Sequence, residues 1–163
     1  MRAGDILLFR GNSGIGKIIQ WGTKSKYSHI ALCVSPKMNL AIEAQGTVRA
    51  RDIRLIKTPY DIFRIKEEYD YNLDKVISFL VSKLNHKYDY LGVIFLGILK
   101  LFRLKKTANK WQKKRDYFCS ELIWEAFAYE GLNIVPDKKE GSIVSPGDIA
   151  KSPVVVGPIK GKS

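Results

Sequence analysis

Alternating apolar and polar positions fill the first 65 residues and predict a series of short β-strands. The expected strands cover residues 5–9, 28–34, 40–45, 48–56 and 60–65, with turn residues between them. Two ionisable side chains interrupt this apolar pattern. His29 shares a face of its strand with Cys33, and Glu43 lies on the face opposite Ile42 and Ala44.

The hydrophobic period changes to that of an α-helix after residue 72. Asn72 is the expected N-cap of a helix over residues 73–84. The core-facing stripe of this helix comprises Leu73, Val76, Ile77, Leu80, Val81 and Leu84.

The second half of the chain predicts mainly helices. We expect helices over residues 90–102 and 119–130, with Gly131 ending the second of these. A turn at 144–149 and an edge strand at 154–156 follow. Strands that come first and helices that come later predict an α+β fold, and the chain is short enough for residues 1–163 to form a single domain.

Composition is that of a folded basic protein. Hydrophobic residues make up 45%, enough apolar surface to offset the entropy lost on folding. Twenty-eight Lys and Arg against 16 Asp and Glu give a formal charge of +12, which attracts nucleic acid, anionic lipid headgroups or acidic glycans. Residues 100–115 carry eight of these basic residues and no acidic one. This segment is either a solvated loop or a contact for an anionic membrane or another polyanion.

Several features bear on the compartment. The longest apolar run, residues 90–99, is well short of the ~20 residues that span a bilayer. The first five residues leave no room for an export signal, so we expect a cytoplasmic protein, with peripheral membrane contact as an alternative. Cys33 and Cys119 lie in differently patterned segments, which fits a reducing compartment better than a disulfide.

Residues 11–18 (GNSGIGKI) follow a strand and lead into a short helix expected around residues 15–23, as a phosphate-binding loop does. Gly11, Gly16 and Lys17 fit the pattern G-x-x-x-x-G-K-[ST], but Ile18 stands where the Mg²⁺-binding hydroxyl is required. We therefore interpret the loop as a strand-to-helix connection that shapes one wall of a neighbouring site. Lys17 is a candidate contact for an anionic substrate.

Cys119 stands at the first turn of its predicted helix, within residues 117–122 (YFCSEL). A helix N-terminus and a neighbouring imidazolium both favour a thiolate. With His29 as a base and Glu43 to orient it, the three residue types form the triad used in covalent acyl transfer. Cys33 is in mid-strand and is expected to be a small core residue.

These segments resemble the circularly permuted papain-like enzymes of the NlpC/P60 superfamily, in particular the YiiX/YaeF-like branch. The matching stretches are residues 4–9 (GDILLF), 27–32 (YSHIAL), 41–44 (AIEA), 88–91 (YDYL), 117–122 (YFCSEL) and 145–148 (SPGD). The order histidine, glutamate, cysteine is that of the permuted branch. The resemblance implies a small antiparallel sheet or barrel packed against helices.

Carried onto this chain, the resemblance implies that Cys119 is the nucleophile, His29 the general base and acid, and Glu43 the residue that orients the imidazole. The backbone N–H of Cys119 is an expected oxyanion donor, and Tyr117 and Tyr27 are candidates for a second. The expected activity is hydrolysis of an amide in a small-molecule, peptide or lipid-linked acyl substrate. We expect neither a metal nor another cofactor.

Two other functions are kept as alternatives. Lecithin retinol acyltransferase-like enzymes act on lipids, often with a histidine where this chain has Glu43, and the segments at 90–99 and 100–115 would suit such an acyltransferase or deacylase at a membrane. The second alternative is a basic polyanion-binding module with a non-catalytic papain-like fold, in which Trp111 stacks on a base. No specific nucleic acid is predicted, since no recognised motif appears. The oligomeric state is left open.

Overall fold

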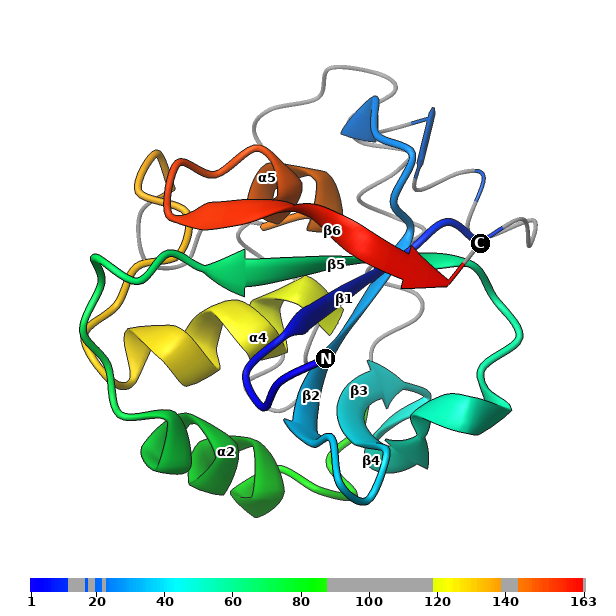
Figure 1. Cartoon of the computed structure of the whole chain (residues 1–163), viewed down its shortest axis with the longest axis horizontal. Coiled ribbons are helices and arrows are strands. Elements are labelled where there is room, and N and C mark those ends of the chain that lie inside the picture. The colour runs from blue at the N-terminus through cyan, green and yellow to red at the C-terminus, as the bar shows by residue number, and fades with distance from the viewer. Residues whose placement is uncertain (12–16, 18–19, 22, 88–118, 139–143, 163) are drawn as a thin grey trace.

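A computed structural model describes residues 1–11, 17, 20–21, 23–87, 119–138 and 144–162 (Figure 1). Its framework is a six-stranded antiparallel sheet in the order β4-β3-β2-β1-β5-β6. The strands are β1 (Ile6–Phe9), β2 (His29–Ser35), β3 (Leu40–Gln45), β4 (Thr47–Asp52), β5 (Tyr60–Ile65) and β6 (Val155–Lys162). The described α-helices are α2 (Leu73–Ser82), α4 (Cys119–Ala128) and α5 (Pro146–Ala150), and a 3₁₀ helix, η1, covers Ile53–Leu55. The α+β class is confirmed.

The sheet has an apolar core on each face. Alternate residues of β1 divide between them: Ile6 and Leu8 face the helices, and Leu7 and Phe9 face the opposite side. The larger core holds the inner sides of α2 and α4, which pack against each other and are drawn side by side in Figure 1. All four residues of β1 are therefore buried, as expected for a central strand covered on both sides.

Helices begin where side chains satisfy the free N–H groups of a first turn. Asn72 caps α2 as predicted, its Oδ1 accepting a hydrogen bond from the Lys75 N–H at 3.1 Å. The core-facing stripe is narrower than predicted, because Val76 and Leu80 are buried whereas Val81 is about half exposed. The predicted third helix is confirmed as α4, and Gly131 follows it with a positive φ of 78°.

Three predicted boundaries were wrong. The strand expected over 48–56 ends at Asp52, whose carboxylate accepts the Arg54 N–H and starts η1. The turn expected over 144–149 contains the helix α5, because Ser145 and Asp148 form a reciprocal capping box. The edge strand expected at 154–156 extends to Lys162 as β6, with register shifts in its pairing to β5.

Two other predicted elements lie largely or wholly outside the described residues. The helix over 90–102 falls entirely outside them. Of the short helical segment after the glycine loop, residues 17, 20, 21 and 23 are described, and their backbone is helical.

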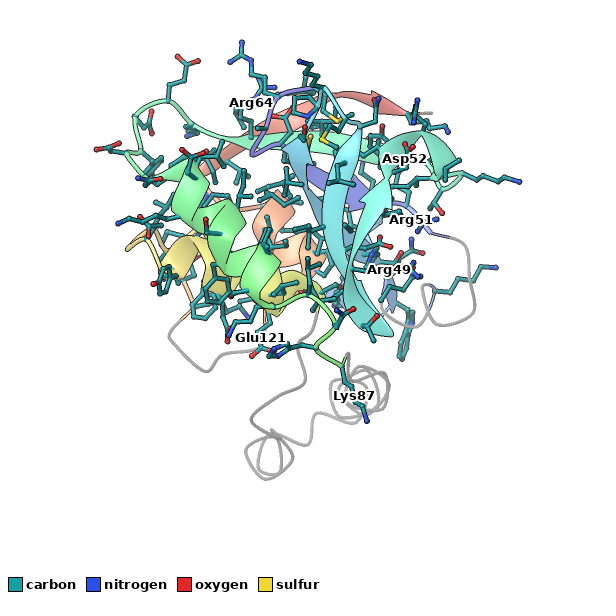
Figure 2. All side chains as sticks on the ribbon, turned by 90° about the horizontal axis from the view of Figure 1, so that it is seen from below. Arg49, Arg51, Asp52, Arg64, Lys87 and Glu121 are labelled. Atoms are coloured by element: carbon teal, nitrogen blue, oxygen red, sulfur yellow. The ribbon has the colours of Figure 1, made fainter. Side chains whose placement is uncertain are left out.

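A buried ion pair fixes the start of the sheet. Asp5 is fully buried, and its two carboxylate oxygens accept hydrogen bonds from Nε and Nη2 of Arg64 at 2.7 and 2.9 Å. The Asp5 carboxylate also accepts the backbone N–H of Arg2 at 2.6 Å. Figure 2 shows Arg64 well apart from Arg49 and Arg51, which belong to the site described next. The ion pair therefore connects β1 to β5 away from that site.

Candidate active site

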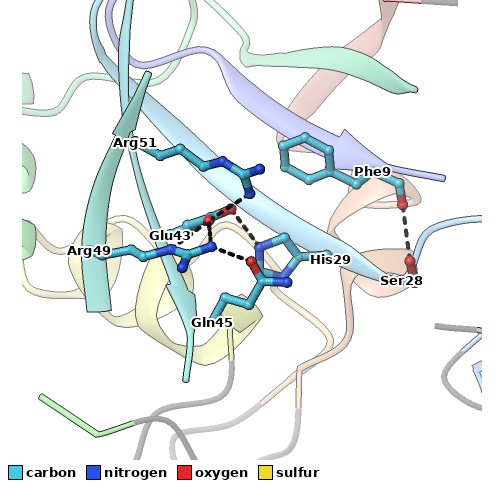
Figure 3. Close-up of polar contacts among 7 residues, drawn as sticks. All are labelled: Phe9, Ser28, His29, Glu43, Gln45, Arg49 and Arg51. Atoms are coloured by element: carbon cyan, nitrogen blue, oxygen red, sulfur yellow. Dashed lines mark hydrogen bonds and ion pairs between the residues drawn. The ribbon is translucent and has the colours of Figure 1, made fainter. Parts of the chain in front are cut away.

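His29 is the first residue of β2, and its position is set by β1. The two strands pair so that His29 lies opposite Phe9, and the Ser28 N–H donates to the Phe9 carbonyl at 2.9 Å. Figure 3 draws the contact of the Ser28 hydroxyl with the same carbonyl. The Phe9 ring lies 5.4 Å from the imidazole between ring centroids. This packing leaves about one fifth of the His29 side chain exposed.

Glu43 comes from the neighbouring strand β3 and faces His29. Its partner in the β2–β3 register is Ala31, two residues after His29 and on the same face. The Glu43 side chain is 1% exposed, and Oε2 lies 3.0 Å from Nε2 of His29 (Figure 3). The sequence prediction that adjacent strands bring these two side chains together is confirmed.

Two arginines of β4 complete the surroundings of this carboxylate. Arg49 donates from Nε and Nη2 to Oε1 of Glu43 at 3.0 and 2.8 Å, and also to the side-chain oxygen of Gln45. Arg51 donates from Nη1 to the same Glu43 oxygen at 3.2 Å. Sequence analysis did not single out either arginine. The pattern that could have indicated them is the alternation in residues 47–52 (TVRARD), which places both arginines on one face of β4.

Cys119 reaches this site from the other layer of the molecule. It is the first residue of α4, which packs against β2 and β3, and it is 5% exposed. The start of the helix is held by Ser120, whose hydroxyl donates to the Val144 carbonyl at 2.6 Å. The side chains of Cys119 and His29 are hydrogen-bonded. Because Nε2 of His29 faces Glu43, Nδ1 is the ring nitrogen left for the sulfur.

The protonation of His29 follows from these neighbours. Burial by itself would lower the pKa of His29, but hydrogen bonds with Cys119 and Glu43, and the negative charge of both, raise it to about 9. Burial would raise the pKa of Glu43, but the hydrogen bond and charge of His29, with the help of Arg49 and Arg51, lower it to about 2. At neutral pH, the site therefore holds an imidazolium between a carboxylate and the cysteine side chain.

Cys33 occupies a different environment. It is fully buried in mid-strand, in the smaller apolar core, as predicted. Burial and the negative charge of Asp5 raise the pKa of its thiol to about 11. A thiol with such a pKa is a weak nucleophile at neutral pH.

The remaining predicted site residues are placed as follows. Tyr27 is buried, its hydroxyl donates to Oδ2 of Asp61 at 2.7 Å, and its ring packs against Phe63. Because its one hydroxyl proton is donated to Asp61, Tyr27 is poorly placed to act as the second oxyanion donor. Lys17 is exposed. Tyr117 and both segments invoked for membrane contact, 90–99 and 100–115, lie outside the described residues.

Comparison with known protein families gives no match for this sequence, and neither does comparison with curated proteins. Among solved structures, the chain is similar to a crystal structure described as metalloprotein yiiX from Escherichia coli O157:H7, DUF1105. The two share 19% identity with a TM-score of 0.68, over 95% of this chain and 94% of the other. At this identity the likeness establishes the fold, an α+β architecture like that of YiiX.

The residues described here do not suit a metal. None of their His, Cys, Asp and Glu side chains form a group of three or more that could hold a metal ion. Glu43, the carboxylate of the site, is already bonded by two guanidinium groups, whose charge opposes a cation. Within the same described residues, the search for a helix that combines the length and the apolar character needed to cross a bilayer finds none.

Proposed function

We propose that this protein is a cysteine hydrolase that cleaves an amide bond through an acyl-enzyme. Cys119 is the nucleophile, His29 the general base and acid, and Glu43 the residue that orients the imidazole. One observation carries the proposal: a single imidazole is hydrogen-bonded both to a buried carboxylate, at 3.0 Å, and to a cysteine at the start of a helix. Thiol, imidazole and carboxylate in that sequence are the parts of an activated nucleophile.

The reaction follows from the protonation states. With the proton on His29, the sulfur of Cys119 attacks the carbonyl carbon, and a C–S bond forms as the carbonyl π electrons move to oxygen. The C–N bond then breaks, and the leaving amine takes the proton of the imidazolium. In the second half, His29 accepts a proton from water while the hydroxide attacks the thioester, and the C–S bond breaks to release the acid.

The N-terminus of α4 adds stabilisation to the charged species. Backbone N–H groups at a helix start carry partial positive charge, which favours a developing oxyanion. The Cys119 N–H, at the start of α4, is our proposed oxyanion donor. The hydrogen bond from the Ser120 hydroxyl to the Val144 carbonyl helps to hold this first turn in place.

Chain order supports a circularly permuted papain-like assignment. His29 and Glu43 come from strands that precede the helix of Cys119 in the sequence. The fold likeness to YiiX agrees with the sequence motifs that pointed to this branch. We therefore place the chain among the permuted papain-like hydrolases as part of the proposal.

An activated ester tests the nucleophile without knowledge of the natural substrate. Incubation with p-nitrophenyl acetate should release p-nitrophenol and leave one acetyl group on Cys119, located by mass spectrometry of the digested protein. Acylation should be absent in Cys119→Ala and about 100-fold slower in His29→Ala. Cys33→Ala is the matched control and should react like the native protein. Acetylation of Cys119 at the same rate with and without the imidazole would overturn the proposal.

A further inference from the structure

The Glu43 carboxylate has more positively charged partners than are needed to neutralise its single negative charge. His29 binds one of its oxygens, while Arg49 and Arg51 both donate to the other. The Asp5 pair provides an internal reference, because there one guanidinium group, with bonds of 2.7 and 2.9 Å, and one backbone N–H, from Arg2, satisfy a fully buried carboxylate. One of the two guanidinium groups at Glu43 is therefore in excess of what burial of the carboxylate demands.

The two arginines are engaged to different degrees. Arg49 makes two bonds to Glu43 and one to Gln45, which fixes the plane of its guanidinium group. Arg51 makes one bond, at 3.2 Å, within the described part of the chain. Guanidinium carries five N–H donors, so most of the donors of Arg51 remain for another acceptor. Its side chain is one third exposed, which gives such an acceptor access.

Strand register directs Arg51 to the face that carries the site. Arg49 lies opposite Glu43 in the β3–β4 pairing, and Arg51 lies opposite Ala41, whose methyl group is too small to cover it. Figure 3 shows the guanidinium group of Arg51 on the same side of the sheet as the imidazole of His29 and the Glu43 carboxylate. A group bound to Arg51 would therefore lie beside the hydrogen-bonded pair that activates Cys119.

We propose that Arg51 binds an anionic group of the substrate, a carboxylate or a phosphate, while Arg49 holds Glu43 in place. The enzyme would then select acyl compounds that carry an oxyanion near the scissile carbonyl. The planar fork of guanidinium suits both oxyanions. This inference rests on the proposed function, since it assigns a substrate class to the same site.

Charge-matched alkylating probes test the inference. N-Iodoacetylglycine carries a carboxylate, N-iodoacetylglycinamide is its neutral counterpart, and N-iodoacetylaminomethylphosphonate represents the phosphate class. Each forms a C–S bond with Cys119 and releases iodide. The quantity measured is the rate for each anionic probe divided by the rate for the amide, in the native protein, Arg51→Gln, Arg51→Lys and Arg2→Gln.

Arg2→Gln is the control for net charge. It removes the same charge from an exposed side chain that lies before β1, at the end remote from Phe9 and His29. This control is needed because a formal charge of +12 attracts any anion. The rate ratio should fall by about fivefold in Arg51→Gln, stay near the native value in Arg2→Gln, and be largely kept in Arg51→Lys. The anionic probe with the larger ratio identifies the class of substrate group.

Failure of this inference can be told apart from failure of the proposed function. A neutral probe that modifies Cys119 no faster than a free thiol would contradict the function itself. Rapid reaction of the neutral probe, with the same rate ratio in Arg51→Gln and Arg2→Gln, would overturn the role of Arg51 alone. Should Arg51→Gln not fold, inorganic phosphate provides the test on the native protein. It should slow N-iodoacetylglycine more than the amide when compared with chloride at equal ionic strength, and equal slowing would overturn the inference.

Discussion

Two buried carboxylates, Asp5 directly before β1 and Glu43 within β3, are both paired with arginine but differ in what surrounds them. Asp5 has one arginine, Arg64, which binds both of its oxygens. Glu43 divides its oxygens between a histidine and two arginines. Each carboxylate also has a cysteine in its neighbourhood. Cys33, near Asp5, has a pKa raised to about 11, whereas Cys119 is hydrogen-bonded to the histidine that Glu43 binds.

Under the proposed function, this difference separates a structural ion pair, at Asp5, from a catalytic one, at Glu43. The Asp5 carboxylate is satisfied by one guanidinium group and the backbone N–H of Arg2, and no titratable side-chain nitrogen links Asp5 to Cys33 in the described contacts. At Glu43, the histidine connects the carboxylate to a sulfur and can carry a proton between a substrate and water. We therefore expect a reactive thiol only at the second of these sites, where an imidazole lies between the buried acid and the cysteine.

The largest effect on stability is expected from breaking the ion pair between Asp5 and Arg64. Asp5→Asn removes the charge that compensates Arg64 and should reduce the free energy of unfolding by about 3 kcal/mol in urea titrations. Cys119 in the folded variant should still be alkylated by iodoacetamide at the native rate. Asp52→Asn, at the exposed pair with Arg54, is the control and should lose far less. Loss of Cys119 reactivity in folded Asp5→Asn would show that the two carboxylates do not act separately.

The His29–Glu43 part of this comparison could be predicted from the sequence because the strands there alternate regularly, whereas the Asp5–Arg64 pair was not predicted. The period of two over residues 40–45 put Glu43 on the correct face, and β3 has the predicted bounds. The same reasoning failed for the arginines of β4, because charged residues on an edge strand are ordinarily solvent-exposed. Their role depends on which strand lies beside β4, and that is a property of the sheet order rather than of local sequence.

Removing the charge of Glu43 is expected to have an intermediate effect, on the pKa of His29 and on the reactivity of Cys119. In Glu43→Gln, the imidazole loses the partner that favours its proton while Arg49 and Arg51 remain, so the pKa of His29 should fall below about 9. Alkylation of Cys119 by iodoacetamide at pH 7 should slow about tenfold. The pKa is measurable by NMR, since the chain has only two histidines and His86→Gln assigns the signals.

Glu67→Gln provides the matched control for that measurement. Glu67 is almost fully exposed and pairs only loosely with Arg2, at 4.0 Å. It should change neither the His29 titration nor the alkylation rate. A His29 pKa that is the same in Glu43→Gln and Glu67→Gln would mean that the hydrogen bond at 3.0 Å does not set the basicity of the ring.

Contacts between residues far apart in the chain were harder to predict from the sequence than the strands were. Nothing in the local pattern around residues 119–130 states that α4 starts beside His29, 90 residues earlier in the chain; the family resemblance supplied that expectation. The helix α5 was missed although its capping residues, Ser145 and Asp148, have the required spacing, because Pro146 and Gly147 between them are typical of a turn. Proline at the start of a helix is compatible with helical geometry, so the capping box of Ser145 and Asp148 could start a helix here rather than a turn.

The smallest effect is expected in the pH dependence of stability. The pKa of His29 is raised from 6.5 to about 9, so its stabilising contribution is complete below about pH 6.5 and is lost as the pH rises through 9. The pKa of Glu43 is lowered from 4.5 to about 2, so its contribution is complete above about pH 4.5 and is lost as the pH falls toward 2. Both contributions are complete between about pH 4.5 and 6.5.

Urea unfolding from pH 5 to 9.5 tests this course in the native protein and in His29→Gln. The difference in unfolding free energy between the two should be largest near pH 6 and smaller by about 1 kcal/mol or more at pH 9.5, because the imidazolium that holds Glu43 and Cys119 has by then lost its proton. His86→Gln is the control for loss of a histidine elsewhere. A difference between native protein and His29→Gln that stays constant over this range would mean that His29 titrates alike in folded and unfolded chains. The ion pair with Glu43 would then contribute no net stability, and the contrast with the Asp5 pair would rest on chemistry alone.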